Sequence, residues 1–156
     1  MKRIILFFSS NAGLGYAPVA SGTFGTLMGI PLYWLLARLE QQEFVLAWVF
    51  ILLLSFWSAH RAGEIYGVVD DGRIVIDELI GYLTAIAFVP FSWTTAIVAF
   101  LLFRLFDIVK LWPANWFDRK VKNGVGVVLD DVVAGLYAWL SLYALMSFFP
   151  DFFLLF

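Results

Sequence analysis

The chain has 156 residues, a length suited to one domain. Hydrophobic residues make up 63% of it and charged residues 14%, against about 25% charged residues in ordinary soluble domains. A small globule has too much surface to hide this apolar excess, so the composition indicates a membrane protein. The net charge of −2 gives no sign of a nucleic-acid partner, and the lack of cysteine excludes disulfides and zinc-thiolate sites.

The N-terminal region precedes the first predicted helix. Met1–Phe8 resembles the start of a signal peptide, but its apolar run is too short for one, so we expect it in the mature protein. Asn11–Thr26 then contains four glycines and one proline. Thr23 or Ser21 could cap the following helix and leave backbone N–H groups free for a phosphate. A re-entrant or surface loop fits this segment equally well.

Four stretches without charged residues predict the helices. They are Phe24–Ala37, Phe44–Ala59, Leu79–Phe103 and Val132–Pro150. The third is too long for one helix, and we expect it to break at Val89–Trp93, because Pro90 ends a helix and Ser92 can cap the next. We therefore predict an all-α fold: a compact bundle of about five membrane-embedded helices in a single domain, residues 1–156.

Several of these helices are shorter than the roughly 20 residues of a simple membrane span. Short helices are tolerated where their ends lie in a polar recess lined by protein. The alternative is a soluble all-α bundle with unusually apolar helices.

The basic residues predict the orientation in the membrane. If the N-terminus is cytoplasmic and the chain crosses five times, only Arg38 lies on the far side. The basic residues on the cytoplasmic side are then Lys2, Arg3, Arg61, Arg73, Arg104, Lys110, Arg119, Lys120 and Lys122. This arrangement places every candidate site residue at the cytoplasmic face.

Two pairs of adjacent acids begin predicted helices, Asp77-Glu78 and Asp130-Asp131. One acid at a helix start is explained by the helix dipole, which is worth about 0.3–1 kcal/mol. Two adjacent carboxylates repel each other, and a divalent cation would remove that conflict. Oxygen ligands without cysteine favour Mg²⁺, Mn²⁺ or Ca²⁺ over zinc.

A glycine follows one acid of each pair by four residues, Gly81 after Asp77 and Gly135 after Asp131. Residues at this spacing share one face of a helix. Small residues on such a face let a neighbouring helix approach closely. The pattern therefore predicts close helix packing one turn from the acids.

Three charged residues interrupt the end of the fourth predicted helix, Arg104, Asp107 and Lys110. Their spacing of three places them on one sector of the helix. They could form an intrahelical ladder at the membrane interface. Charges inside a span more often mark a functional site, in which Asp107 joins the metal site while Arg104 and Lys110 bind an anion.

Five carboxylates, an oxygen-preferring metal and cations at a membrane surface together indicate phosphoryl chemistry on a phospholipid. The expected partners are therefore the phospholipid substrate and the bilayer, and no obligatory protein partner is evident. The alternatives are a small membrane ion transporter and another metal-dependent phospholipid phosphotransferase. A phosphotransferase of the CDP-alcohol type would need an extended aspartate motif that this sequence lacks.

Four segments resemble the motifs of the phosphatidylglycerophosphatase A family, in the same order and spacing. They are GTFGTLMGIP, IVIDELIG, FRLFDIVKLWPANWFDR and NGVGVVLDDVVAG. The resemblance runs from about Gly13 to Gly135. It implies a Mg²⁺-dependent, multi-pass enzyme of the bacterial inner membrane that hydrolyses phosphatidylglycerophosphate to phosphatidylglycerol and phosphate.

The resemblance also implies roles for residues at the matching positions. The predicted catalytic acids are Asp77, Asp107 and Asp130. The predicted metal ligands are Asp77, Glu78, Asp107, Asp130 and Asp131. The predicted phosphate-binding residues are Thr23, Arg104 and Lys110, and the predicted cofactor is Mg²⁺.

Overall fold

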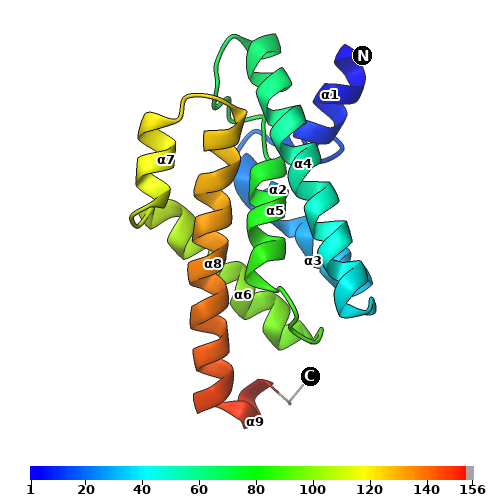
Figure 1. Cartoon of the computed structure of the whole chain (residues 1–156), viewed down its shortest axis with the longest axis vertical. Coiled ribbons are helices and arrows are strands. Elements are labelled where there is room, and N and C mark those ends of the chain that lie inside the picture. Colours follow the sequence, from blue (N-terminus) through cyan, green and yellow to red (C-terminus); the bar gives the residue numbers. More distant parts are fainter. Residues whose placement is uncertain (154–156) are drawn as a thin grey trace.

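The computed structural model describes residues 1–153, which form helices and loops with no strand in that range (Figure 1). The elements are α1 (Lys2–Ser9), the 3₁₀ helix η1 (Leu14–Tyr16), α2 (Ser21–Leu27), α3 (Gly29–Leu36), α4 (Gln41–Tyr66), α5 (Ile76–Ala85), α6 (Trp93–Val109), α7 (Ala114–Lys120), α8 (Gly124–Phe148) and α9 (Pro150–Phe153). The predicted all-α class is confirmed.

The five predicted helices are present in modified form. The first is divided into α2 and α3, and the two pieces both pack against the α5 segment. Gly25 meets Val75 just before α5, and Gly29 meets the ring of Tyr82 within it. The other four correspond to α4, α5, α6 and α8, but α8 begins at Gly124, so Asp130 and Asp131 lie past its first turn and do not begin the helix as predicted. Over residues 1–153, two helices are long and apolar enough to cross a membrane, α4 with 26 residues and α8 with 25.

Local capping explains where several helices begin. The Ser92 hydroxyl accepts a hydrogen bond from the Thr95 N–H at 3.0 Å, so the predicted cap of α6 is confirmed. At α2 the prediction was wrong, because the capping position is Ala20. Ser21 instead donates its hydroxyl proton to the Gly72 carbonyl at 2.6 Å. Thr23 lies half-buried within the helix.

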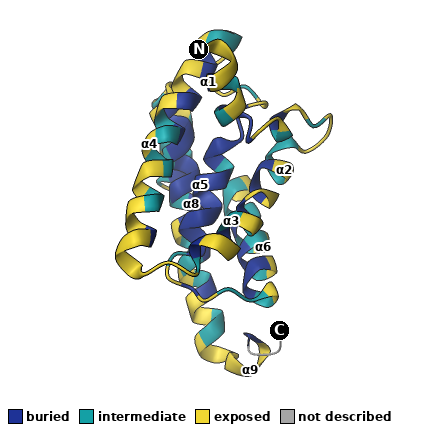
Figure 2. Cartoon of the chain, turned by 90° about the vertical axis from the view of Figure 1, so that its right-hand side faces the viewer, coloured by how far each residue is buried: buried dark blue, intermediate teal, exposed yellow. Residues whose placement is uncertain are grey.

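Helix α5 occupies the centre of the bundle, with α8 alongside it (Figures 1 and 2). Ile80, Tyr82 and Leu83 of α5 are completely buried, as are Ala138 and Leu142 of α8. Helix α4 lies on the outside, and only 22% of its apolar window is buried. The core helices therefore hold the bundle together, while α4 presents a continuous apolar surface outward.

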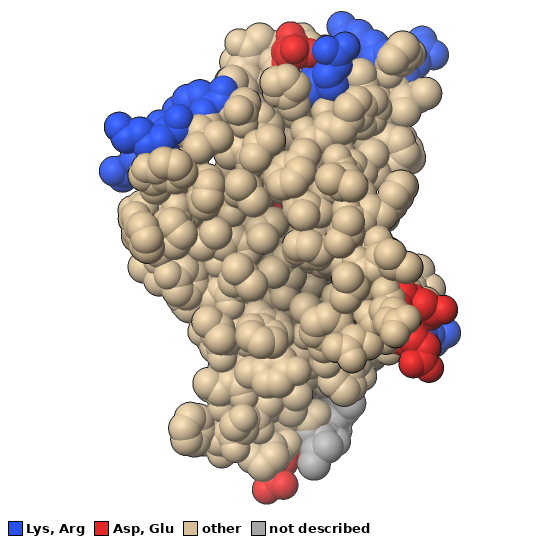
Figure 3. Space-filling view, viewed as in Figure 1, with Lys and Arg blue, Asp and Glu red and all other residues tan. Residues whose placement is uncertain are grey.

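Charge is concentrated at the two ends of the molecule. Figure 3 shows Lys and Arg side chains over α7 and α1 at the upper end, and an almost uncharged surface below them. Acidic side chains lie in the lower half, over the start of α4 beside a basic side chain and over α9 at the bottom, and acidic atoms also appear among the basic ones at the upper end. Helix α5 begins in the upper half, nearer the basic end (Figure 1).

Candidate active site

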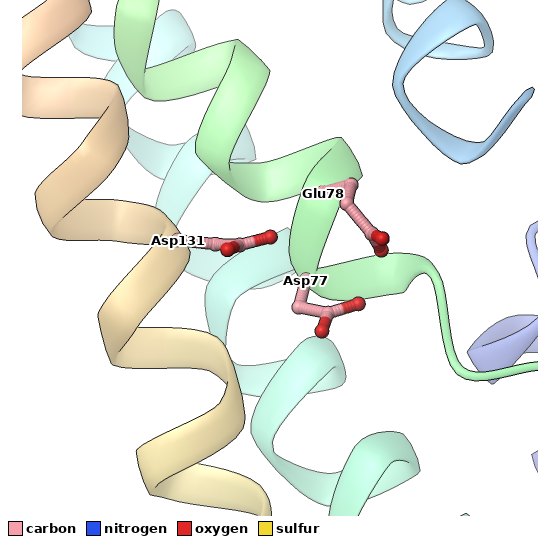
Figure 4. Close-up of side chains that lie close together, drawn as sticks. All are labelled: Asp77, Glu78 and Asp131. Atoms are coloured by element: carbon pink, nitrogen blue, oxygen red, sulfur yellow. The ribbon is translucent and has the colours of Figure 1, made fainter. Parts of the chain in front are cut away.

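Three carboxylates from two helices meet in the interior. Asp77 and Glu78 lie in the first turn of α5, and Asp131 points from α8 toward them (Figure 4). One oxygen of each carboxylate lies within 4.8 Å of the others. Asp77 is 6% exposed and Asp131 is 4% exposed. The structure thus brings three of the five predicted metal ligands into one buried cluster, which we call the acidic triad.

Two glycines allow this approach. A Cβ on Gly81 would lie 2.8 Å from the Asp131 carbonyl oxygen, and a Cβ on Gly135 would overlap the Gly81 carbonyl. Helices α5 and α8 therefore touch backbone to backbone one turn from the triad, which confirms the close packing predicted from the glycine spacing. This contact places Asp77 and Asp131 on facing sides of the helix pair.

The triad contains oxygens that the protein leaves unpaired. Among the described residues, Asp77 Oδ1 and Glu78 Oε2 are buried without a hydrogen-bond partner. Buried carboxylates without compensation are strongly unfavourable. Three close carboxylates with free oxygens, and no sulfur or imidazole beside them, provide the donor set that Mg²⁺ prefers. The residues therefore fit the predicted metal.

Asp107 and Arg104 of α6 lie next to the triad. Arg104 Nη1 is 2.6 Å from Asp107 Oδ2, and Asp107 lies near Asp131. Arg104 Nη1 is buried and makes this ion pair without a well-aligned hydrogen bond, so its donor capacity is not fully used. The predicted anion-binding arginine is thus placed beside the acids with protons still to donate.

Helix α2 forms the facing wall. A Cβ on Gly22 would overlap Glu78 Oε1 and would lie 3.2 Å from Arg104 Nη1. Helix α2 therefore lies close to Glu78 at Gly22, where an added side chain would displace the Glu78 carboxylate. Thr23, the third predicted phosphate-binding residue, follows Gly22 on the same short helix.

Lys110 and Asp130 form a separate cluster. Lys110 Nζ lies 2.6 Å from Asp130 Oδ2 and 2.9 Å from Asp118 Oδ1, and so links α6, α7 and α8. The other oxygen of Asp130 accepts a hydrogen bond from the Asp131 N–H at 3.1 Å. Asp130 is therefore already paired in the structure, unlike the acids of the triad.

Two acids of this region were not predicted as site residues. Asp118 occurs in the NWFDR part of the third motif, and Asp70 lies in the turn before α5, near both Asp77 and Asp130. Together with Lys122, these two acids line a cavity of about 230 Å³. The position of Asp118 within the third motif was a signal that could have identified it from the sequence.

The turn before α5 is held by its own ion pair. Arg73 donates hydrogen bonds to both carboxylate oxygens of Asp71, at 2.6 and 2.8 Å. These hydrogen bonds hold the pKa of the Asp71 carboxyl below its usual range. Arg73 also stacks on the Tyr66 ring, 3.7 Å from its centroid. Asp71 therefore supports the turn, and its carboxylate is already paired with Arg73.

The chain is similar to known proteins over most of its length. The family model described as Phosphatidylglycerophosphatase A matches residues 7–146. Phosphatidylglycerophosphatase A of Escherichia coli is 35% identical over 88% of this chain and 81% of its own length. The Haemophilus influenzae protein of the same name is 38% identical over 85% of this chain and 83% of its own.

A third relative has a different name. A Bacteroides thetaiotaomicron protein, named provisionally as a phosphatidylinositol-3-phosphatase, is 36% identical over 90% of this chain and 94% of its own length. No solved structure matches the chain. The family match spans the triad, Arg104 and Lys110. The chain therefore belongs to the phosphatidylglycerophosphatase A family and is an enzyme of the phosphatase class.

Proposed function

We propose that this enzyme hydrolyses the terminal phosphate of phosphatidylglycerophosphate, using Mg²⁺ held by Asp77, Glu78 and Asp131. The observation that carries the proposal is the acidic triad, whose buried oxygens lack protein partners. The names of the Escherichia coli and Haemophilus influenzae relatives supply the substrate. Mg²⁺ bound there would supply Lewis acidity toward the phosphoryl group.

The residues around the triad then have defined tasks. Arg104 binds the phosphoryl oxygens with its unused donor capacity and neutralises charge that develops on them. A carboxylate accepts the proton of the attacking water, because the only histidine, His60, is exposed and lies beside Glu64. Asp107 is the best placed of the predicted catalytic acids Asp77, Asp107 and Asp130, since it pairs with Arg104 and lies near Asp131.

Lys110 and Asp130 enter the proposal as a pair. In the structure Lys110 neutralises Asp130, which fixes the backbone beside Asp131. We propose that Lys110 also attracts the phosphate and that Asp130 and Asp107 support the metal from beside the triad. Thr23 contributes its hydroxyl from α2, the wall that faces Glu78.

The proposed location is the bacterial inner membrane, with the chain as one integral, multi-pass domain. Two helices of membrane-spanning length, the exposed apolar surface of α4 and the uncharged surface between the two ends support this location. The concentration of basic residues at the end nearer the start of α5 supports a cytoplasmic active site.

The test is phosphate release by the purified full chain in detergent micelles. We expect release from phosphatidylglycerophosphate with Mg²⁺ and loss of release with EDTA. Phosphatidylinositol 3-phosphate is the matched second substrate, because the third relative is named for it. Faster release from that lipid would overturn the substrate assignment. Turnover that survives EDTA would overturn the metal, and ion flux in vesicles without phosphate release would favour a transporter.

A further inference from the structure

The N-terminal loop, which we define as the segment from Ser9 at the end of α1 to Ser21 at the start of α2, is hydrogen-bonded to the segment that leads into α5. The Ser9 carbonyl accepts a hydrogen bond from the Val75 N–H at 2.8 Å. Ser21 donates to the Gly72 carbonyl in the same segment. Val75 is the capping residue of α5 and lies two positions before Asp77. The loop therefore braces the turn from which Asp77 and Glu78 project.

Asn11 is the buried centre of this brace. Its side chain is 6% exposed, and its amide nitrogen donates to the Val75 carbonyl at 2.6 Å and to the Gly25 carbonyl at 3.3 Å. Both amide protons are therefore used, one on the start of α5 and one inside α2. The residue has a φ of 48°, in the left-handed region that asparagine tolerates better than most residues.

These two hydrogen bonds link α2 to the start of α5, and α2 lies beside the triad residue Glu78. Gly22 of α2 lies against the Glu78 carboxylate and next to Arg104 Nη1, so a shift of α2 relative to α5 would change what surrounds Glu78. We propose that Asn11 is a positioning residue that holds Glu78 and Asp77 in register for the metal. The inference rests on the proposed function, since it concerns the same site.

The test compares two substitutions of Asn11 in the purified full chain. Asn11→Gly removes the amide and keeps a residue that adopts the left-handed backbone without strain. Asn11→Asp keeps the shape and removes the donating amide. For both we expect kcat for phosphatidylglycerophosphate to fall about tenfold or more. The Mg²⁺ concentration that gives half of the metal-induced rise in Tm should increase by about tenfold, a usual effect of losing support around a metal site.

Tyr33→Phe is the matched control. The Tyr33 hydroxyl is also buried and donates to the Pro90 carbonyl at 2.7 Å, beyond the other end of α5. Removing it should lower the Tm measured without metal. It should leave kcat and the Mg²⁺ requirement at wild-type values, because the triad lies at the opposite end of the helix.

The outcomes separate the two proposals. If the Asn11 variants lose Tm as Tyr33→Phe does yet keep the wild-type kcat and Mg²⁺ requirement, Asn11 is only structural and the inference is wrong. If Asn11→Gly does not fold, the same comparison with Asn11→Asp decides. A wild-type chain with neither Mg²⁺-dependent turnover nor a Mg²⁺-induced rise in Tm overturns the proposed function, and this inference with it.

Discussion

At the scale of single residues, the buried carboxylates differ in what neutralises them. Asp131 belongs to the triad and forms no ion pair with a basic side chain of residues 1–153, whereas Asp130 beside it is paired with Lys110. The adjacent residues Asp130 and Asp131 of α8 therefore have different partners, Lys110 for Asp130 and the other triad acids for Asp131. Substitutions should show this difference in both activity and stability.

Asp131→Asn removes one triad carboxylate. We expect phosphate release to fall by more than about 100-fold, since loss of a ligand exceeds the usual effect of changing its supporting residues. Without Mg²⁺ the Tm should hold or rise, because like-charge repulsion within the triad is reduced. The rise in Tm on adding Mg²⁺ should disappear. Asp151→Asn, an exposed acid on α9, is the control and should behave as wild type.

Lys110→Met leaves Asp130 buried without its cation. The free energy of unfolding should fall by about 1–3 kcal/mol, the usual penalty for an unsatisfied buried polar group. Adding Asp130→Asn to that variant should recover much of the loss, because the uncompensated charge is removed. Denaturant unfolding in detergent measures both. Additive losses in the double variant would show that the pair is not coupled.

At the scale of helices, the contact between α5 and α8 sets the spacing of the triad. Gly135→Ala would place a methyl group against the Gly81 backbone and Thr84. We expect the free energy of unfolding to fall by about 1–3 kcal/mol, as overpacking does. Phosphate release should fall further than the folded fraction accounts for. Gly72→Ala is the control, since its added Cβ would meet nothing nearer than Ser21 Oγ at 4.0 Å, an ordinary contact distance. A Gly135→Ala enzyme with wild-type turnover would contradict this role.

At the scale of the whole molecule, the charged ends predict the orientation in the membrane. The chain has no cysteine, so single introduced cysteines can be labelled without other changes. We expect a membrane-impermeant maleimide to label Gln42→Cys, at the start of α4, from outside spheroplasts. Lys120→Cys, at the end of α7, should be labelled only in inverted membrane vesicles. Labelling of both from the same side would contradict the proposed orientation.

The sequence alone predicted much of the architecture. Charge-free stretches, Pro90 and the Ser92 cap locate α4, α6 and α8 because these signals act over a few neighbouring residues. The glycine spacing predicted close helix packing one turn from the acids, though not which helices meet, because side chains four apart share a helix face. The division of α2 from α3 was missed, although Gly29 and Pro31 at the start of α3 are local signals for a break.

The candidate site divides in the same way. Residue types and order pointed to a family, to carboxylates and to an oxygen-preferring metal, because these are properties of the chain itself. Which acids share a cluster depends on long-range packing. Asp77, Glu78 and Asp131 converge because two glycines let their helices touch, while Asp130 faces Lys110 on α6. Asn11 joined the site for the same reason: its partner Val75 lies 64 residues away, beyond the reach of any local pattern.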